Sequence, residues 1–151
     1  MALRLNKLYE KVALFYDDEI GCMGIAILVT ADEAIGKGSV CSVIQGGTAN
    51  RVKKTPISGN ENDMPIGVAL TAAAGAGSTF WMCTNGLVQV LPDTGITAAQ
   101  GYVITASSTT AGMVAQAATA PAAATHFKEV GHWATTGTSN GALTLAYIHF
   151  N

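Results

Sequence analysis

The sequence predicts an all-β fold, a small barrel or sandwich-like domain built from a duplicated strand-turn-strand unit. The first observation is the segment Ile66–Thr84, in which two apolar strand patterns flank a small-residue turn at Gly75 and Gly77. The second is Val130–Ile148, which repeats this plan 64 positions further along. Because two copies are too few for a solenoid, we expect the copies to close around one core.

The spacing of glycines is the third observation. Gly67 and Gly77 of the first copy have counterparts 64 positions later, at Gly131 and Gly141. The segments that lead into the two copies also match, at an offset of 63 positions: Gly38–Val43 and Gly101–Ala106. The match therefore extends over whole β units and is not limited to one turn.

Length and composition indicate one domain that associates. A chain of 151 residues is long enough to bury a core without cross-links. Charged residues make up only 12 % of the chain, about half of the usual share, and 49 % of the residues are hydrophobic. A surface with so little charge favours association, so we expect an oligomer or a component of an assembly.

Charge and hydropathy argue against nucleic-acid and membrane partners. The net charge is −2, and the basic cluster at Arg51, Lys53 and Lys54 is too short to form a nucleic-acid-binding patch. The longest apolar run, Ile20–Val29, is about half of what a membrane-spanning helix needs. The segment Met1–Arg4 does not open a secretory signal peptide, so we expect a chain used without crossing a membrane.

The N-terminal segment has two interpretations. In Met1–Val12, apolar side chains recur at helical spacing at Leu5, Leu8 and Tyr9, which predicts a short amphipathic helix. Such a helix is marginal alone, and the alternative is an arm that orders only against a partner. Residues 13–151 then form a single β domain, whose first strands are expected at Ala13–Tyr16, Met23–Val29, Ser39–Ile44 and Ala49–Thr55.

The strongest local turn signal is Asn85-Gly86, because both residues tolerate the positive φ of a type I′ turn. It predicts a hairpin between Thr79–Thr84 and Leu87–Leu91. The later strands are expected at Tyr102–Ala106, Met113–Ala117 and Leu143–Phe150, and polar or low-complexity loops at Pro56–Pro65 and Ala118–Thr125. The last strand is apolar on both faces, so it is either central or covered by a neighbouring subunit.

No residue pattern points to catalysis, a cofactor or a metal. The segment Gly75–Thr79 lacks the lysine of a phosphate-binding loop and is explained by a tight turn. No nucleophile elbow occurs, so we expect no enzyme. Three cysteines, each in an apolar segment, predict buried free thiols, and three scattered histidines without a Cys-x-x-Cys pair predict no zinc site: Cys22, Cys41, Cys83, His126, His132 and His149.

Several of these segments, taken in order, resemble the small capsid cement, or head decoration, proteins of tailed bacteriophages. The family pattern is a Gly-led strand start, an I-G-V-A-L strand, a G-x-V-x-V strand, a second Gly-led start and a closing hairpin. Here these segments are Gly38–Val40, Pro65–Leu70, Gly86–Val90, Ala99–Val103 and Val130–Ala134. The resemblance covers about Thr30–Phe150. The chain departs from the family in Gly38-Ser39, Gly101-Tyr102 and His132-Trp133, where the family favours Gly-Asp or small aliphatic residues.

The resemblance implies a β-tulip-like homotrimer that binds the outside of an expanded capsid and clamps neighbouring major capsid subunits. Such a protein is made in the host cytoplasm and ends on the virion. Binding only the expanded shell would stabilise that state by mass action. A different class is a non-catalytic carbohydrate- or receptor-binding β module of a phage tail or surface structure, which would present exposed aromatic residues.

Two groups of residues are candidates for contacts. For capsid contact these are four apolar residues of the N-terminal arm, with packing on the protein's own core as the alternative: Leu3, Leu5, Leu8 and Tyr9. For a subunit interface these are four aromatic residues, again with core packing as the alternative: Trp81, Trp133, Tyr147 and Phe150.

Overall fold

The computed structural model describes residues 3–44, 46–47, 50–57, 63–117, 123–138 and 141–150. In these residues the chain is almost entirely β-structure, as the sequence predicts, with one 3₁₀ helix, η2 (Ala123–Lys128). The strands are β1 (Arg4–Tyr9), β2 (Val12–Asp17), β3 (Cys22–Ala31), β4 (Val40–Val43), β5 (Arg51–Lys54), β6 (Pro65–Ala69), β7 (Thr79–Val90), β8 (Thr97–Ala98), β9 (Val103–Ala106), β10 (Val114–Gln116), β11 (Glu129–Trp133), β12 (Gly137–Thr138) and β13 (Thr144–Ile148).

The first half of the chain closes into a five-stranded barrel. Its strands pair in the order β3-β5-β4-β6-β7, and β7 pairs back to β3. Only the pair of β3 with β5 is parallel. The barrel interior is filled by apolar side chains that alternate with outward-facing residues along the strands: Val29, Ala31, Ile35, Cys41, Val52, Ala69, Ala73, Phe80 and Met82.

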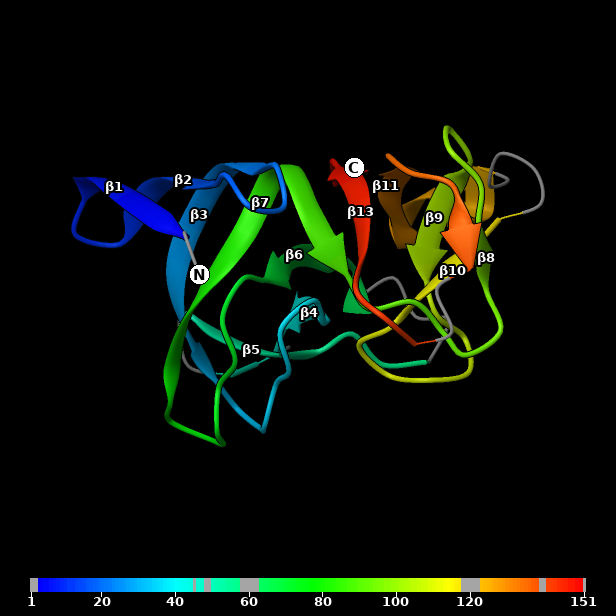
Figure 1. The fold of residues 1–151 in the computed structure, drawn as a ribbon. Coiled ribbons are helices and arrows are strands. Elements are labelled where there is room, and N and C mark those ends of the chain that lie inside the picture. Colours follow the sequence, from blue (N-terminus) through cyan, green and yellow to red (C-terminus); the bar gives the residue numbers. More distant parts are fainter. Residues whose placement is uncertain are drawn as a thin grey trace.

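The long strand β7 links this barrel to the second half of the chain. Its first part pairs with β3 and β6, and its last residues pair with β13. From β13 the sheet continues through β11 and β9 to β10, and a parallel bridge between Pro92 and Val114 leads back to the end of β7. Figure 1 shows β3 to β6 on one side of the molecule and β8 to β11 on the other. The second half therefore forms a second ring.

The two rings confirm the duplication residue by residue. Cys41 lies opposite Gly67 in the first ring, and Ile104 lies opposite Gly131 in the second, at the offsets read from the sequence. Three further pairs of the first ring have equivalents in the second. Val40–Val68 corresponds to Val103–His132, and Ala69–Met82 corresponds to Trp133–Ala146. The parallel pair Ala31–Val52 corresponds to Pro92–Val114. The repeated unit is thus a strand register as well as a sequence pattern.

The hairpin predicted at Asn85-Gly86 is wrong, because β7 runs straight through both residues. The pairing with β3 shifts register at this point, where Ile25 lies opposite Asn85 and Ala26 opposite Cys83. Gly86 has a φ of +138° and faces Gly24 so closely that a Cβ on Gly86 would lie 2.2 Å from the carbonyl oxygen of Met23. The glycine serves a bulge and a close approach of two backbones instead of a turn.

The helix predicted within Met1–Val12 is also wrong. Arg4–Tyr9 is a strand that pairs antiparallel with β2, across a turn at Glu10 and Lys11. Because Leu5 lies opposite the buried Phe15, pairing with β2 outweighs the weak helical pattern. Met1 and Ala2 lie outside the described residues, and so do residues 58–62 and 118–122 of the two predicted loops.

Candidate interaction surface

A row of apolar side chains crosses four neighbouring strands on the outer face of the sheet. Tyr16 on β2 lies opposite Met23 on β3, Met23 opposite Leu87 on β7, and Leu87 opposite Tyr147 on β13. Directly opposed residues of antiparallel strands point to the same face. The row continues to His132 on β11, which lies opposite Tyr147. We call this row and its two neighbours, Leu14 and Ile25, the apolar face.

The apolar face is accessible to solvent. Met23 is 53 % exposed and Tyr147 55 %, while Tyr16 is 45 % exposed. Leu14 and Ile25, which lie opposite each other on β2 and β3, are 45 % and 42 % exposed. Contiguous exposed apolar residues of this size are rare on monomeric proteins and mark interaction sites.

A shallow groove runs along the centre of this face. It has a volume of about 460 Å³ and is lined by Met23, Asn85, Gly86, Leu87, Tyr147, Ile148 and His149. Gly86, which lines the groove, has no room for a side chain, because a Cβ there would lie 2.2 Å from the carbonyl oxygen of Met23. The groove offers mostly apolar walls to a partner.

The four N-terminal candidates divide into two pairs. Leu3 and Leu5 are half-buried and pack against the core. Leu8 and Tyr9 lie at the end of β1 and are 51 % and 76 % exposed. Figure 1 shows the β1–β2 hairpin extending from the side of the first barrel. The structure thus leaves only the last two residues available for a contact with another protein.

The four aromatic candidates also separate. Trp133 is buried in the second ring, and Trp81 and Phe150 are half-buried against the same core cluster. Tyr147 alone is largely exposed, at the centre of the apolar face. Sequence reasoning identified Tyr147 but missed Tyr16, Met23 and Leu87. Their strand register, which the sequence does not reveal, brings them beside it.

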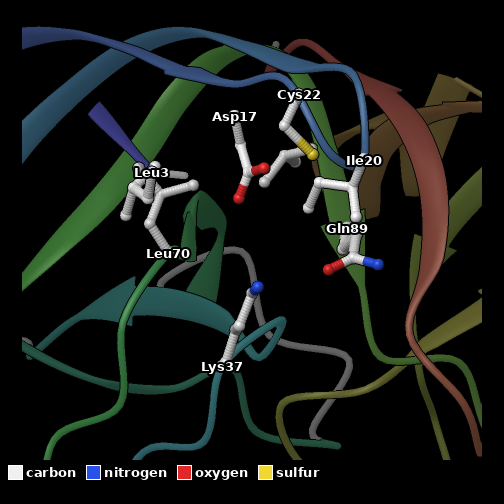
Figure 2. A pocket seen from close by; sticks show the side chains of 8 residues that line it. Leu3, Asp17, Ile20, Cys22, Lys37, Leu70 and Gln89 are labelled. Atoms are coloured by element: carbon white, nitrogen blue, oxygen red, sulfur yellow. The ribbon is translucent and has the colours of Figure 1, made fainter. Parts of the chain in front are cut away.

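A second hollow lies beneath the start of the chain and is too small for a ligand. Its volume is about 10 Å³, the space of a single water molecule. Figure 2 shows Asp17 and Lys37 directed toward this space from opposite sides, with Leu3, Leu70 and Ile20 around them. Asp17 is only 3 % exposed and accepts a hydrogen bond from the backbone N–H of Glu19. This buried carboxylate orders the β2–β3 turn.

The three cysteines are free and buried, as predicted. Burial raises the pKa of Cys41 and of Cys83 to about 12, and it also raises the pKa of Cys22. At neutral pH these thiols are protonated, so they are poor nucleophiles and poor metal ligands.

The histidines are brought together, contrary to the scattered distribution expected from the sequence. His126, His132 and His149 gather around the buried carboxylate of Glu129, at the end of the apolar face where His132 lies. The three residues lie up to 23 positions apart along the chain and match no short metal motif. Only the pairing of β11 with β13 makes them neighbours.

Comparisons with known proteins bear on the fold. No protein-family model matches this chain, and no curated protein sequence matches it. Among solved structures, the head fibre gp8.5 N base of bacteriophage phi29 is similar, with a TM-score of 0.54 and 14 % sequence identity over 82 % of this chain and 92 % of that chain. No helix in the described part of the chain has the length and hydrophobicity to cross a membrane. At this identity the likeness concerns the fold alone: the two chains share a β architecture over most of their lengths.

Proposed function

We propose that this chain is a structural protein of a bacteriophage virion that binds the outside of the expanded capsid and clamps neighbouring major capsid subunits. The observation that carries the proposal is the fold shared with a phage head-fibre base over most of both chains. The cement-protein motifs of the sequence point to the same place on the virion.

The apolar face is proposed as the contact between copies of this chain. Its exposed members come from β2, β3 and β13, with the half-buried Leu87 of β7 between them, so a rigid sheet presents them together. Charged residues are only 12 % of the chain, which removes the usual repulsion between copies. The resemblance to trimeric cement proteins makes three copies the expected number, with Tyr147 at the centre of each contact.

Contact with the shell is proposed for the tip of the β1–β2 hairpin. Leu8 and Tyr9 are exposed there, whereas Leu3 and Leu5 hold the base of the hairpin to the core. A protein that binds the expanded shell more tightly than the unexpanded one stabilises expansion by the difference in binding free energy, summed over all copies. The role needs no chemistry beyond binding.

The sugar-binding alternative finds less support. Trp133 is 1 % exposed and Trp81 is half-buried, so neither indole ring is free to stack on a sugar. Exposed tyrosines remain, but the two on the apolar face lie in a row of aliphatic residues. The alternative therefore stands as an outcome of the test below.

Co-sedimentation with empty shells tests the proposal. The wild-type chain is mixed with expanded and with unexpanded shells of the phage whose genome carries the sequence, and the bound fraction is measured. We expect saturable binding to expanded shells and at least tenfold weaker binding to unexpanded ones. The double variant Leu8→Ser/Tyr9→Ser keeps the leucines that pack on the core, so it should fold and lose shell binding.

A matched control is Ile57→Ser, which removes an apolar side chain that is 50 % exposed at a site outside β1 and the apolar face. It should bind shells as the wild type does. Equal binding by the wild type and the double variant would contradict the role of the hairpin tip. A wild-type chain that ignores expanded shells would contradict the function itself and make glycan binding the next test.

A further inference from the structure

All three histidines of this chain converge on one buried carboxylate. Glu129 is at the start of β11, and its side chain is 7 % exposed. His126 comes from η2, His132 from β11, and His149 directly follows β13. A chain with three histidines among 151 residues rarely places them together by chance, so the cluster calls for a physical account.

The fold brings these side chains together through two features of β11. A register shift between Glu129 and Gly131, against β9, allows both Glu129 and His132 to reach one side of the strand. The pairing of β11 with β13 places Ile148 opposite Gly131, and the N–H of His149 donates to the carbonyl oxygen of Val130 at 3.0 Å. The imidazole of His149 is thereby held next to that of His132.

The distances within the cluster are those of a ligand set. The Nδ1 atom of His132 lies 3.1 Å from Nε2 of His149. The same Nε2 lies 3.7 Å from Oε1 of Glu129, and the three ligand atoms are all within 4.8 Å of one another. Two ligands of a tetrahedral zinc ion, each about 2.0–2.1 Å from the metal, are about 3.3–3.4 Å apart. The two separations measured from Nε2 of His149, 3.1 and 3.7 Å, bracket this value.

We propose that Glu129, His132 and His149 bind a Zn²⁺ ion. Two neutral imidazoles and one carboxylate are a common zinc donor set, and three protein ligands leave the fourth position to water. The half-exposed rings of His132 and His149 give the ion a path from solvent, while the buried carboxylate supplies charge where water is scarce. This inference does not depend on the proposed virion role.

His126 is assigned a positioning role. Its Nδ1 lies 3.1 Å from Oε2 of Glu129, the carboxylate oxygen that does not face His149. Such a contact to a metal-binding carboxylate fixes its orientation, with Oε1 on the side of His149. His126 is 50 % exposed, so replacing it should disturb the metal site more than the core.

Competing ligands in the same chain are weak. The three cysteine thiols are buried, and the raised pKa values of Cys41 and Cys83, about 12, keep them protonated at neutral pH. Zinc binding by the folded chain should therefore report on the histidine cluster. The metal-free alternative is a hydrogen bond between His132 and His149 with an ion pair to Glu129, which would bind no metal.

Isothermal titration calorimetry of Zn²⁺ binding to the untagged chain at pH 7.5 tests the proposal. We expect one Zn²⁺ per chain with a dissociation constant below about 1 µM. His132→Gln and His149→Gln should each weaken binding at least a hundredfold, and His126→Gln about ten- to a hundredfold. The control Asp18→Asn, which alters an exposed carboxylate elsewhere, should bind as the wild type does.

Cobalt provides a second readout that does not depend on affinity alone. Co²⁺ in the wild-type site should give visible absorption bands of tetrahedral intensity, and these should be absent from His132→Gln and His149→Gln. Circular dichroism confirms that the variants are folded. The proposal is overturned by a dissociation constant weaker than about 1 µM, or by binding that is unchanged in both histidine variants.

Discussion

Trp133 on β11 and Ala146 on β13 lie directly opposite each other, at the positions that Ala69 and Met82 occupy on β6 and β7. All four residues are buried. The large side chain has thus changed strands between the two rings, while each pair keeps one large and one alanine member. The duplicated units preserve the strand register and the pairing of a large residue with alanine in this core layer, but not the strand that carries the large residue.

This exchange predicts coupled effects on stability. Trp133→Ala should lower the free energy of unfolding by about 3–5 kcal/mol, because it leaves a cavity in the second ring. Ala146→Met alone should cost about 1–3 kcal/mol by overpacking. The double variant copies the pair of the first ring, so we expect it to be less destabilised than the sum of the two single variants in urea denaturation. Additive costs would show that the two rings are not packed alike.

The contact between Gly24 and Gly86 predicts that neither position tolerates a side chain. A Cβ at Gly24 would lie 2.2 Å from the carbonyl oxygen of Asn85, so Gly24→Ala should lower the midpoint of thermal unfolding by ten degrees or more. Gly75→Ala is the matched control, since a Cβ there meets nothing within 4 Å. Similar melting temperatures for the two variants would contradict the close approach of β3 and β7.

The apolar face predicts that a charge at its centre separates the subunits. Tyr147→Asp should convert the oligomer to monomer at concentrations where the wild type is associated, because a carboxylate cannot be buried unpaired in an apolar contact. Since Tyr147 is exposed in the single chain, the variant should remain folded. Val43→Asp replaces another apolar residue that is 48 % exposed, outside this face, and should leave the mass in light scattering unchanged. If both variants kept the wild-type mass, the interface would lie elsewhere.

The buried thiols predict a loss of stability at alkaline pH. In the unfolded chain a cysteine loses its proton near its ordinary pKa of 9.0, whereas burial holds Cys41 and Cys83 protonated up to about 12. The folded state therefore binds more protons between these values, and the free energy of unfolding falls as the pH rises above 9. The variant Cys41→Ala/Cys83→Ala should show a shallower fall in urea denaturation between pH 8 and 10.5. An identical slope in the wild type and the variant would mean that groups other than these two thiols cause the loss of stability.

The sequence predicted the duplicated β architecture well because glycine positions record strand register. Gly67 and Gly131 are equivalent in both sequence and pairing, and most strands lie where the apolar patterns place them. A glycine in the sequence, however, does not by itself show whether it serves a turn or a close approach of two backbones. Asn85-Gly86 satisfies a type I′ turn locally, but Gly24 on a neighbouring strand decides that Gly86 serves a close approach.

The N-terminal strand and the two candidate sites could not be predicted for a related reason. Leu5, Leu8 and Tyr9 fit a helix by spacing, and only the position of β2 makes the segment a strand. The apolar face and the histidine cluster each combine residues from separate strands. β11 and β13 pair in the same register as β6 and β7. Transferring the pairing of the first copy to the second would therefore have predicted His132 and His149 as neighbours, so the duplication contained a usable signal.

The solution mass of the untagged wild-type chain, measured by light scattering with and without expanded empty shells, tests the central claim most directly. The account predicts a trimer in solution that binds the shells to saturation at a fixed ratio of chains to capsid subunits. A chain that stays monomeric and leaves the shells unoccupied would contradict it.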